Sequence, residues 1–420
     1  MKRWNYFFLL FVLMIVACSK PPKNSELIVI DLEANIDNFK RVDLSELATE
    51  VEYIPLETNQ NCLISLIRNI DINREFIFIS HYGECLLFDT KGKFISLIGK
   101  KGKCPGEYLY PGLVNIGENS LFISSYRDLL IYNKSGEFIE KVKNPVNFDN
   151  TPFNKNWIPL SDSLFICQIR NVMGQEENKA IIFNRYSDTV QLFPNHIKFN
   201  RIKNSSRTDD GRAEFYFFRN ELFYKEYTDD TLFRLNNKKL MEPVFTFNLG
   251  KFKMPYQLRS LPSAEYMGKI NDYIWIINHF ETEHFFFFKF YFGSHYPFKT
   301  KKEYLIEGES RFGWAPVLGV YKKKTGEAFI VQPPEIDDSV NPNGIGNDWD
   351  GGLNFFPEAR INDSTLLMSF LPYELKKFVR TVAFKNSTPK YPEKKKELER
   401  LAKSLNENDN PVLMLVKLKE

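Results

Sequence analysis

Long hydrophobic runs are scarce in this chain of 420 residues, and the run at the N-terminus is too short to cross a membrane as a helix. It extends from Trp4 to Ala17, whereas a membrane-spanning helix needs about 20 residues. Histidine is also scarce, with five residues. His279 and His284 are close in sequence, but their odd separation would place them on opposite faces of a strand. Neither H-E-x-x-H nor G-x-S-x-G occurs, so no motif indicates a zinc protease or a nucleophile-elbow hydrolase.

The chain also lacks an excess of charge of one sign. Its formal net charge is +3, and removal of Lys2 and Arg3 with a leader segment would reduce it to +1. A protein that binds nucleic acid usually carries a basic stripe or patch. The charge balance therefore predicts no nucleic-acid partner.

Cysteine is limited to five residues, and none of them forms a C-x-x-C pair. Four remain after Cys18, namely Cys62, Cys85, Cys104 and Cys167. An exported chain can form disulfides, and four cysteines allow three pairings, but the spacing favours none of them. Because Cys85 and Cys167 stand in strand-like apolar runs, we expect them to be buried thiols.

The N-terminus has the order of a secretory signal, with Lys2 and Arg3 before the apolar run. The run ends Ile15-Val16-Ala17-Cys18, which resembles the lipobox of bacterial lipoproteins. The resemblance implies a signal peptide over residues 1–17, cleavage before Cys18 and a lipid on Cys18 that anchors the protein to a membrane. Residues 18–26 contain Pro21 and Pro22 and would form a tether. The alternative is an ordinary signal peptide with a chance cysteine.

A repeat of 44 residues is visible when Phe76–Ile95 is placed over Ser120–Ile139 without a gap. Eight positions are identical, and in the first copy they are Phe78, Ile79, Ser80, Tyr82, Leu86, Gly92, Phe94 and Ile95. Each copy contains several short strands separated by turns. This period and strand content are typical of a blade of a β-propeller.

Looser copies follow at residues 162–193, 220–235, 272–331 and 358–371, which makes six units. The sequence therefore predicts an all-β fold, a six-bladed β-propeller over residues 27–420. Continuous apolar strands such as "FFFFKFYF" (Phe285–Phe292) agree, because middle strands of a blade are buried on both faces. The 39 phenylalanines and 20 tyrosines are then expected to fill the space between blades.

Four further segments resemble the six-bladed β-propeller lipoproteins of Bacteroidota. They are "LSELATEVEYIPLET" (Leu44–Thr58), "KGKFISLIGKKGKCPGEY" (Lys91–Tyr108), "DWDGGLNFFP" (Asp348–Pro357) and "DNPVLMLVKLK" (Asp409–Lys419). The resemblance implies the propeller fold and a location in the cell envelope. It implies no reaction.

The stretch "LIGKKGKCPGEY" (Leu97–Tyr108) is rich in glycine and lysine but is not a phosphate-binding loop. The Walker motif needs G-x-x-x-x-G-K-[ST] before a helix, whereas here Gly99 and Gly102 are three apart and strands lie on both sides. We expect a crossing from one blade to the next. It could be a rigid turn in which Glu107 accepts backbone hydrogen bonds, or a rim loop that presents Glu107 or Tyr108 to a ligand.

A propeller must be closed, or its first and last blades would expose strand edges. The final strand is expected at Val412–Leu418, and Leu27–Leu32 and Val51–Glu57 are the candidates to complete its blade from the N-terminal side. Residues 43–48 predict a short helix capped by Asp43 or Ser45. Residues 392–408 predict an amphipathic helix that begins at Pro392, with an apolar face formed by Leu398, Leu401, Ala402 and Leu405.

The most suggestive segment for chemistry is the acidic, glycine-rich stretch Glu335–Gly352. Calcium is bound through carboxylate oxygens, and this stretch offers Asp337, Asp338, Asp348 and Asp350. Their spacing is not that of an EF-hand. The segment could be a rim insertion built from turns, or a metal or sugar site at the mouth of the channel.

Two functions are consistent with these features. The first is a non-catalytic envelope lipoprotein without a cofactor, which binds a glycan or a partner protein through rim loops. The alternative is a calcium-dependent hydrolase or lyase similar to lactonase-like propellers; fold alone does not decide between them. The residues after Cys18 lack the acidic side chains associated with surface export in similar lipoproteins. We therefore expect an outer-membrane lipoprotein that faces the periplasm, with the cell surface as the alternative.

Overall fold

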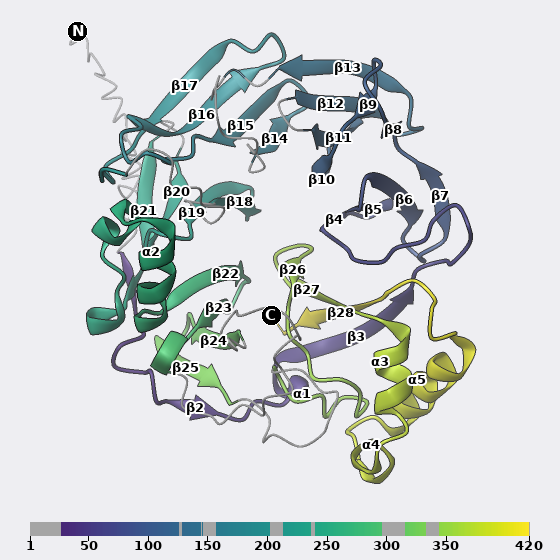
Figure 1. Ribbon diagram of the computed structural model, residues 1–420. Coiled ribbons are helices and arrows are strands. Elements are labelled where there is room, and N and C mark those ends of the chain that lie inside the picture. The colour runs from purple at the N-terminus through teal and green to yellow at the C-terminus, as the bar shows by residue number, and fades with distance from the viewer. Residues whose placement is uncertain are drawn as a thin grey trace, which may run out of the picture.

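Six small sheets stand in a ring around a central channel in the computed structural model (Figure 1). Each sheet is one blade, so the predicted six-bladed β-propeller is confirmed. The structure describes residues 27–125, 128–143, 145, 157–201, 213–236, 240–295, 316–332 and 344–419.

Blades one to three are antiparallel sheets of four strands that follow one another along the chain. Blade one contains β4 (Asn69–Ile72), β5 (Phe76–His81), β6 (Glu84–Asp89) and β7 (Phe94–Leu97). Blade two contains β10 (Pro111–Ile116), β11 (Ser120–Ser125), β12 (Asp128–Asn133) and β13 (Phe138–Lys143). Blade three contains β14 (Trp157–Ser161), β15 (Leu164–Gln168), β16 (Asn178–Asn184) and β17 (Thr189–Pro194). The sequence repeat corresponds to equal pairing, since Ile79 opposes Leu86 in blade one and Ile123 opposes Leu130 in blade two.

Blades four and five each gain a fifth, outer strand from the N-terminal segment. Blade four contains β18 (Ala213–Phe218), β19 (Glu221–Glu226), β20 (Thr231–Leu235) and β21 (Met241–Asn248), with β1 (Ile28–Asp31) parallel to β21. Blade five contains β22 (Trp275–Glu281), β23 (Phe285–Tyr291), β24 (Val317–Lys322) and β25 (Glu327–Val331), with β2 (Phe39–Lys40) parallel to β25.

Blade six closes the ring with strands from both ends of the described chain. It contains β26 (Ala359–Arg360), β27 (Thr365–Phe370), β28 (Val412–Leu418) and β3 (Ala48–Pro55). Strand β3 is the outer strand and runs antiparallel to β28, with Ile54 opposite Leu413. The predicted pairing of Val51–Glu57 with the final strand is therefore confirmed.

The expectation that Leu27–Leu32 also completes this blade is wrong. The eight-residue β3 occupies the free edge of β28, whose other edge is taken by β27. Strand β1 instead covers the outer edge of blade four, where it hides backbone groups that would otherwise be unpaired. Its Ile30 is fully buried in the core between blades four and five.

The packing between blades explains the run of phenylalanines in β23. Successive side chains of a strand point to opposite faces, so the run contacts both neighbouring blades. Phe286 and Phe288 pack into the core shared with blade four, and Phe287 packs into the core shared with blade six. All three are fully buried, which confirms the expected role of the aromatic residues as filling between blades.

The two faces of the ring are distinguished by the path of the chain. We call the face at which the chain reaches each innermost strand the entry face. Because the strands of a blade alternate in direction, the turn between its second and third strands lies on the same face. The entry face therefore carries α2 (Ser263–Lys269), which precedes β22, and the segment between β27 and β28.

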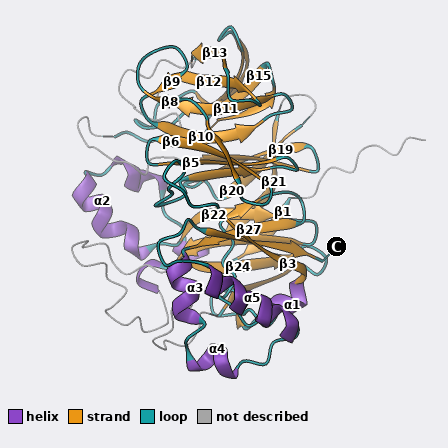
Figure 2. Cartoon of the chain, turned by 90° about the vertical axis from the view of Figure 1, so that its right-hand side faces the viewer, coloured by secondary structure: helices purple, strands orange, loops and turns teal. Residues whose placement is uncertain are grey.

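That segment forms three helices, α3 (Pro372–Phe378), α4 (Val382–Asn386) and α5 (Pro392–Ser404), which lie beside blade six (Figures 1 and 2). The predicted amphipathic helix is confirmed, and Leu398, Ala402 and Leu405 are buried. Lys376 Nζ donates to the carbonyl oxygens of Ala402 and Leu405 and so satisfies the last turn of α5. No helix among the described residues is long and apolar enough to span a membrane.

The remaining elements are short. They are α1 (Leu44–Leu47), β8 (Lys100–Lys101), β9 (Glu107–Tyr108), and the 3-10 helices η1 (Gly250–Phe252), η2 (Tyr256–Ser260), η3 (Ile270–Asp272) and η4 (Gly293–His295). The expected cap of α1 differs from the structure. Asp43 stands at the N-cap position, but its side chain makes no capping bond, and Ser45 lies inside the helix.

The pairing of β28 with β3 yields a first test. Replacing the fully buried Leu413 by alanine should lower the free energy of unfolding by about 2–5 kcal/mol, because the cavity left at the closing strands cannot collapse completely. Urea denaturation would measure the change. The matched control is Leu97→Ala on the exposed edge of β7, which should change stability by no more than about 0.5 kcal/mol. Equal effects of the two substitutions would contradict a tightly packed closure.

Candidate functional site in the central channel

A cavity of about 390 Å³ lies in the central channel. Its walls come from the innermost strand of every blade, or from a residue beside it: β4, β10, β14, β18, β22 and β26. Tyr227, in the turn after β19, completes the lining. Small-molecule sites usually measure about 300–1,000 Å³ and combine apolar walls with a few polar groups. The channel therefore offers a site of the right size for a small polar ligand.

Four buried polar atoms in this wall have no hydrogen-bond partner among the described residues. They are Nδ2 of Asn115, Oε2 of Glu214, and both Nδ1 and Nε2 of His279. Unpaired buried polar atoms are rare in folded proteins because each loses its bond to water without replacement. These atoms belong to residues of β10, β18 and β22, so three blades each contribute to the lining of one cavity a residue with an unused donor or acceptor.

His279 is held by aromatic contacts and not by hydrogen bonds of its ring. Its imidazole stacks on Phe286, with centroids 5.6 Å apart, and meets the edge of Tyr216 at 5.0 Å. Its Nδ1 lies 3.6 Å from Oε2 of Glu214, too far for a hydrogen bond. Burial, reinforced by Lys225 and Arg360, lowers the pKa of His279 to about 3. The ring is thus neutral at physiological pH and offers one donor and one acceptor.

The positive and negative side chains around His279 nearly balance one another. Burial raises the pKa of Glu214 to about 7, although Arg360 and Lys289 act in the opposite direction. Burial also lowers the pKa of Lys289 to about 8, and its ammonium group lies 4.4 Å from the ring centroid of Phe356. The cavity therefore has no strong surplus of positive or negative charge.

Two side chains of blade one form hydrogen bonds to the backbone of blade two and so hold this part of the cavity wall in place. Asn69 Oδ1 accepts from the backbone N–H of Val114 at 2.8 Å, and Asp71 Oδ2 accepts from that of Ile116 at 2.7 Å. Both contacts join β4 to β10. Burial raises the pKa of Asp71. The two hydrogen bonds to the backbone of β10 explain why Asn69 and Asp71 occur at the core of the ring although they are polar.

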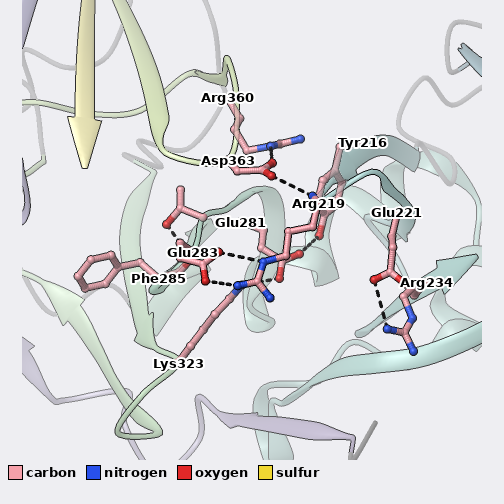
Figure 3. Close-up of polar contacts among 11 residues, drawn as sticks. Tyr216, Arg219, Glu221, Arg234, Glu281, Glu283, Phe285, Lys323, Arg360 and Asp363 are labelled. Carbon is pink, nitrogen blue, oxygen red and sulfur yellow. Dashed lines mark hydrogen bonds and ion pairs between the residues drawn. The ribbon is translucent and has the colours of Figure 1, made fainter. Parts of the chain in front are cut away.

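A network of charges lies at the end of the channel opposite the entry face (Figure 3). Glu281 of β22 accepts from Tyr216 Oη at 2.8 Å and pairs with Lys323 at 2.6 Å. Arg219 pairs with Glu283, and its backbone N–H donates to Oδ2 of Asp363 at 3.0 Å.

The second part of this network joins blade four to blade six, which are not neighbours in the ring. Arg219 follows β18 and Asp363 follows β26, so their contact passes in front of the innermost strand of blade five. Asp363 also accepts from Arg360, which lines the cavity, at 2.9 Å. The network therefore links the turns of blades four, five and six at this face.

The predicted rim residues Glu107 and Tyr108 lie away from the cavity. Glu107 Oε2 accepts from the backbone N–H of Cys104 at 2.9 Å, packs over Gly102, and pairs with Lys100 at 3.2 Å. These contacts hold the pKa of Glu107 below its usual range. Tyr108 is 1 % exposed, and its hydroxyl bonds to the backbone of Cys85 and Ile98. The structure thus shows both residues in a rigid turn between blades one and two.

The acidic segment is also used within the fold where the structure describes it. Asp348 accepts from the backbone N–H and the hydroxyl of Ser45, at 2.8 and 2.6 Å, and so ties this segment to α1. Asp350 is 1 % exposed and accepts from Tyr53 Oη at 2.8 Å. Burial raises the pKa of Asp350.

Asp337 and Asp338 fall outside the described residues. Within the described ranges, no group of three or more His, Cys, Asp or Glu side chains is arranged to hold a metal ion. The calcium site stays a prediction.

Three of the cysteines, Cys62, Cys85 and Cys167, are buried, as expected for the last two. Cys104 is exposed and free. Cys18, the expected lipid attachment site, lies outside the described residues.

Sequence inspection did not identify Asn115, Glu214, His279 or Arg360 as site residues. They are far apart in sequence and form no motif, because each blade contributes only one or two side chains. The available signal is a polar residue within a short apolar run, as with Glu214 in "AEFYFF" and His279 in "WIINHFE". It becomes meaningful only when the innermost strand of each blade is known.

The ring of six sheets around a polar cavity defines the class of the protein, a six-bladed β-propeller with a channel site. The chain belongs to the family described as Domain of unknown function (DUF4934), whose model matches residues 27–417. The expected membership of a Bacteroidota β-propeller family is thereby confirmed. A comparison with curated proteins finds no match.

Similar solved structures share the architecture. A putative exported protein of Bacteroides fragilis is 19 % identical with a TM-score of 0.65, over 94 % of this chain and 100 % of that one. A DUF4221 family member of Bacteroides vulgatus is 12 % identical with a TM-score of 0.50, over 89 % and 97 %. A virginiamycin B lyase of Staphylococcus aureus is 10 % identical with a TM-score of 0.41, over 87 % and 99 %. At these identities the first two establish the fold alone, and the third is too distant to indicate an activity.

The raised pKa of Glu214 predicts a pH-dependent stability. The folded state holds a proton on this carboxyl up to about pH 7, whereas the unfolded state releases it near the ordinary value of 4.5. This contribution to stability is therefore complete below about pH 4.5 and is lost as the pH rises through 7. Glu214→Gln, which mimics the protonated form, should gain stability relative to wild type between pH 5 and pH 8.

Urea denaturation at several pH values would measure this difference. Glu118→Gln, on the exposed turn after β10, is the matched control with the same chemical change. A difference between Glu214→Gln and wild type that stays constant across this range would show that Glu214 is not desolvated in the channel wall.

Proposed function

We propose that this protein is a non-catalytic envelope lipoprotein that binds a neutral glycan in its central channel. The observation that carries the proposal is the set of four unpaired buried polar atoms around one cavity. A ligand that supplied hydrogen-bond partners to these atoms would offset the cost of their burial. Such a ligand must combine donors and acceptors, as sugar hydroxyl groups do.

The rest of the wall supports a sugar over other small molecules. Trp157, Tyr216 and Phe280 contribute aromatic surface beside the polar atoms. Sugars present apolar C–H faces as well as hydroxyl groups, so they suit a wall in which aromatic rings alternate with polar side chains. An acidic ligand would need a surplus of cations, which the near balance of Arg68 and Arg360 against Asp71, Glu214 and Glu358 does not provide.

The channel is a better location for a ligand than the rim loops. Glu107, Tyr108, Asp348 and Asp350 already use their polar atoms within the fold. A cavity of about 390 Å³ also suits a small ligand better than a folded partner protein. The alternative of a calcium-dependent hydrolase or lyase has no specific observation in its favour among the described residues.

The proposed location rests on the N-terminal sequence. The lipobox-like Ile15-Val16-Ala17-Cys18 supports cleavage and lipidation, and residues 18–26 would then lead to β1 on the outer edge of blade four. The description of the similar Bacteroides fragilis protein as exported supports the same compartment. We propose an anchor in the outer membrane, with the propeller in the periplasm.

His279→Phe tests the glycan site because it keeps an aromatic ring on Phe286 but removes both ring nitrogens. On an array of neutral bacterial, plant and host glycans, this variant should lose at least roughly tenfold in affinity for the glycans that bind wild type, about 1.4 kcal/mol. Its melting temperature should stay the same or rise, since a buried group without a partner has been removed. His295→Phe, in the exposed η4, is the matched control. Unaltered glycan binding by His279→Phe would refute the channel site.

Cys18→Ser tests the anchor. Wild-type protein should fractionate with membranes and incorporate a clickable fatty acid during growth, and the variant should do neither, because one acyl-modified residue is the proposed attachment. The comparison is Cys104→Ser, an exposed cysteine within the propeller, which should behave as wild type. Fatty-acid labelling that persists in Cys18→Ser would exclude this residue as the lipid site.

A further inference from the structure

Large apolar side chains are exposed on the entry face above blades one and two. Tyr82 is 60 % exposed and Tyr110 is 64 % exposed, and Leu66 is similarly open at 54 %. Tyr82 stands in the turn between the second and third strands of blade one, and Leu66 and Tyr110 precede the innermost strands of blades one and two. All three therefore belong to the entry face.

Two hydrogen bonds bring these positions together. The backbone N–H of Arg68 donates to the carbonyl oxygen of Ser80 at 2.9 Å, and Ser80 Oγ donates to the carbonyl oxygen of Gly112 at 2.7 Å. Leu66, Tyr82 and Tyr110 each lie two residues beyond one of these bonded positions. They consequently form one cluster over adjacent blades, in contrast to the single exposed apolar residues that are normal on protein surfaces.

Arg68 connects this cluster to the cavity. It lines the cavity, and its guanidinium carbon lies 4.3 Å from the ring centroid of Tyr82. Lys101 Nζ lies 5.8 Å from the ring centroid of Tyr110. Each cation orients a tyrosine ring from one side, and the high exposure of both rings leaves apolar surface open to solvent.

The contacts at the opposite end of the channel also favour extension of a ligand toward the entry face. There Arg219, Glu283 and Asp363 join the turns of blades four, five and six in front of the innermost strand of blade five. A ligand longer than the cavity would therefore extend toward the entry face, where Arg68 and Tyr82 continue its wall.

We propose that Tyr82 and Tyr110 form an outer subsite on which further sugar units of the same glycan stack. This inference rests on the proposed function and specifies its ligand as an oligosaccharide longer than the channel cavity. Neither tyrosine hydroxyl has a hydrogen bond among the described residues, so both are available to the sugar. The rings supply flat apolar surface with little loss of side-chain freedom, as tyrosines do at many recognition sites.

Binding of oligosaccharides of increasing length to the purified full-length protein tests the subsite. The probes are the cello-, malto- and chito-oligosaccharides from two to six units, measured by isothermal titration calorimetry. Wild type should bind the hexamer of at least one series more tightly than its dimer. The double variant Tyr82→Ala/Tyr110→Ala should weaken hexamer binding by roughly tenfold or more and leave dimer binding unchanged. Tyr82→Phe/Tyr110→Phe, which keeps both rings, should retain most of the hexamer affinity.

Tyr186→Ala is the matched control, because Tyr186 is 86 % exposed on the turn between β16 and β17, away from the entry face. Full hexamer affinity in the double alanine variant would overturn the outer subsite while the channel site stood. Equal loss of dimer and hexamer binding would also overturn it, because the tyrosines would then act on the channel itself. Failure of wild type to bind any of the three series, together with no binding on the array of neutral glycans, would instead refute the neutral-glycan function, and the subsite with it.

Discussion

The pairing of β3 with β28 is the constraint on which the rest of the molecule depends. Each blade buries both of its faces against its neighbours, so a gap at one position would expose two apolar surfaces. The antiparallel register that places Ile54 opposite Leu413 removes this gap by joining the two ends of the described chain in one sheet. The outer strands β1 and β2 add a second connection, because the same N-terminal segment passes along blades four and five before it reaches blade six.

Closure also creates the candidate site. Only a complete ring brings Asn115, Glu214 and His279 to one cavity, since they belong to different blades. The fold then holds these polar atoms without hydrogen-bond partners among the described residues. Around them the channel is rigid, because side chains such as Asp71 bind the backbone of the next blade and the Arg219 network joins three blades. A preorganised cavity of this kind loses little freedom when a ligand enters.

The sequence was sufficient to predict the architecture because a propeller repeats one local pattern. The 44-residue period, the apolar middle strands and the terminal strand at Val412–Leu418 all follow from spacing and hydrophobicity. The position of Leu27–Leu32 was mistaken, since an apolar edge strand fits any exposed sheet edge and its sequence does not specify which one. The site was missed for a related reason, because His279 and Glu214 are single polar residues in separate blades. Asp348 and Asp350 form a conspicuous acidic cluster in the sequence, but their oxygens accept hydrogen bonds from Ser45 and Tyr53 within the fold.

The N-terminal strands have a consequence for the order in which the chain can fold. Strand β1 pairs with residues up to Asn248, β2 with residues up to Val331, and β3 with residues up to Leu418. These three strands are therefore synthesised long before their partners. Pairings this distant in sequence form slowly, because the intervening chain must be ordered first. A chain arranged in this way can form blades one to three from consecutive strands, but it completes its ring only when its last strand, β28, has paired with β3.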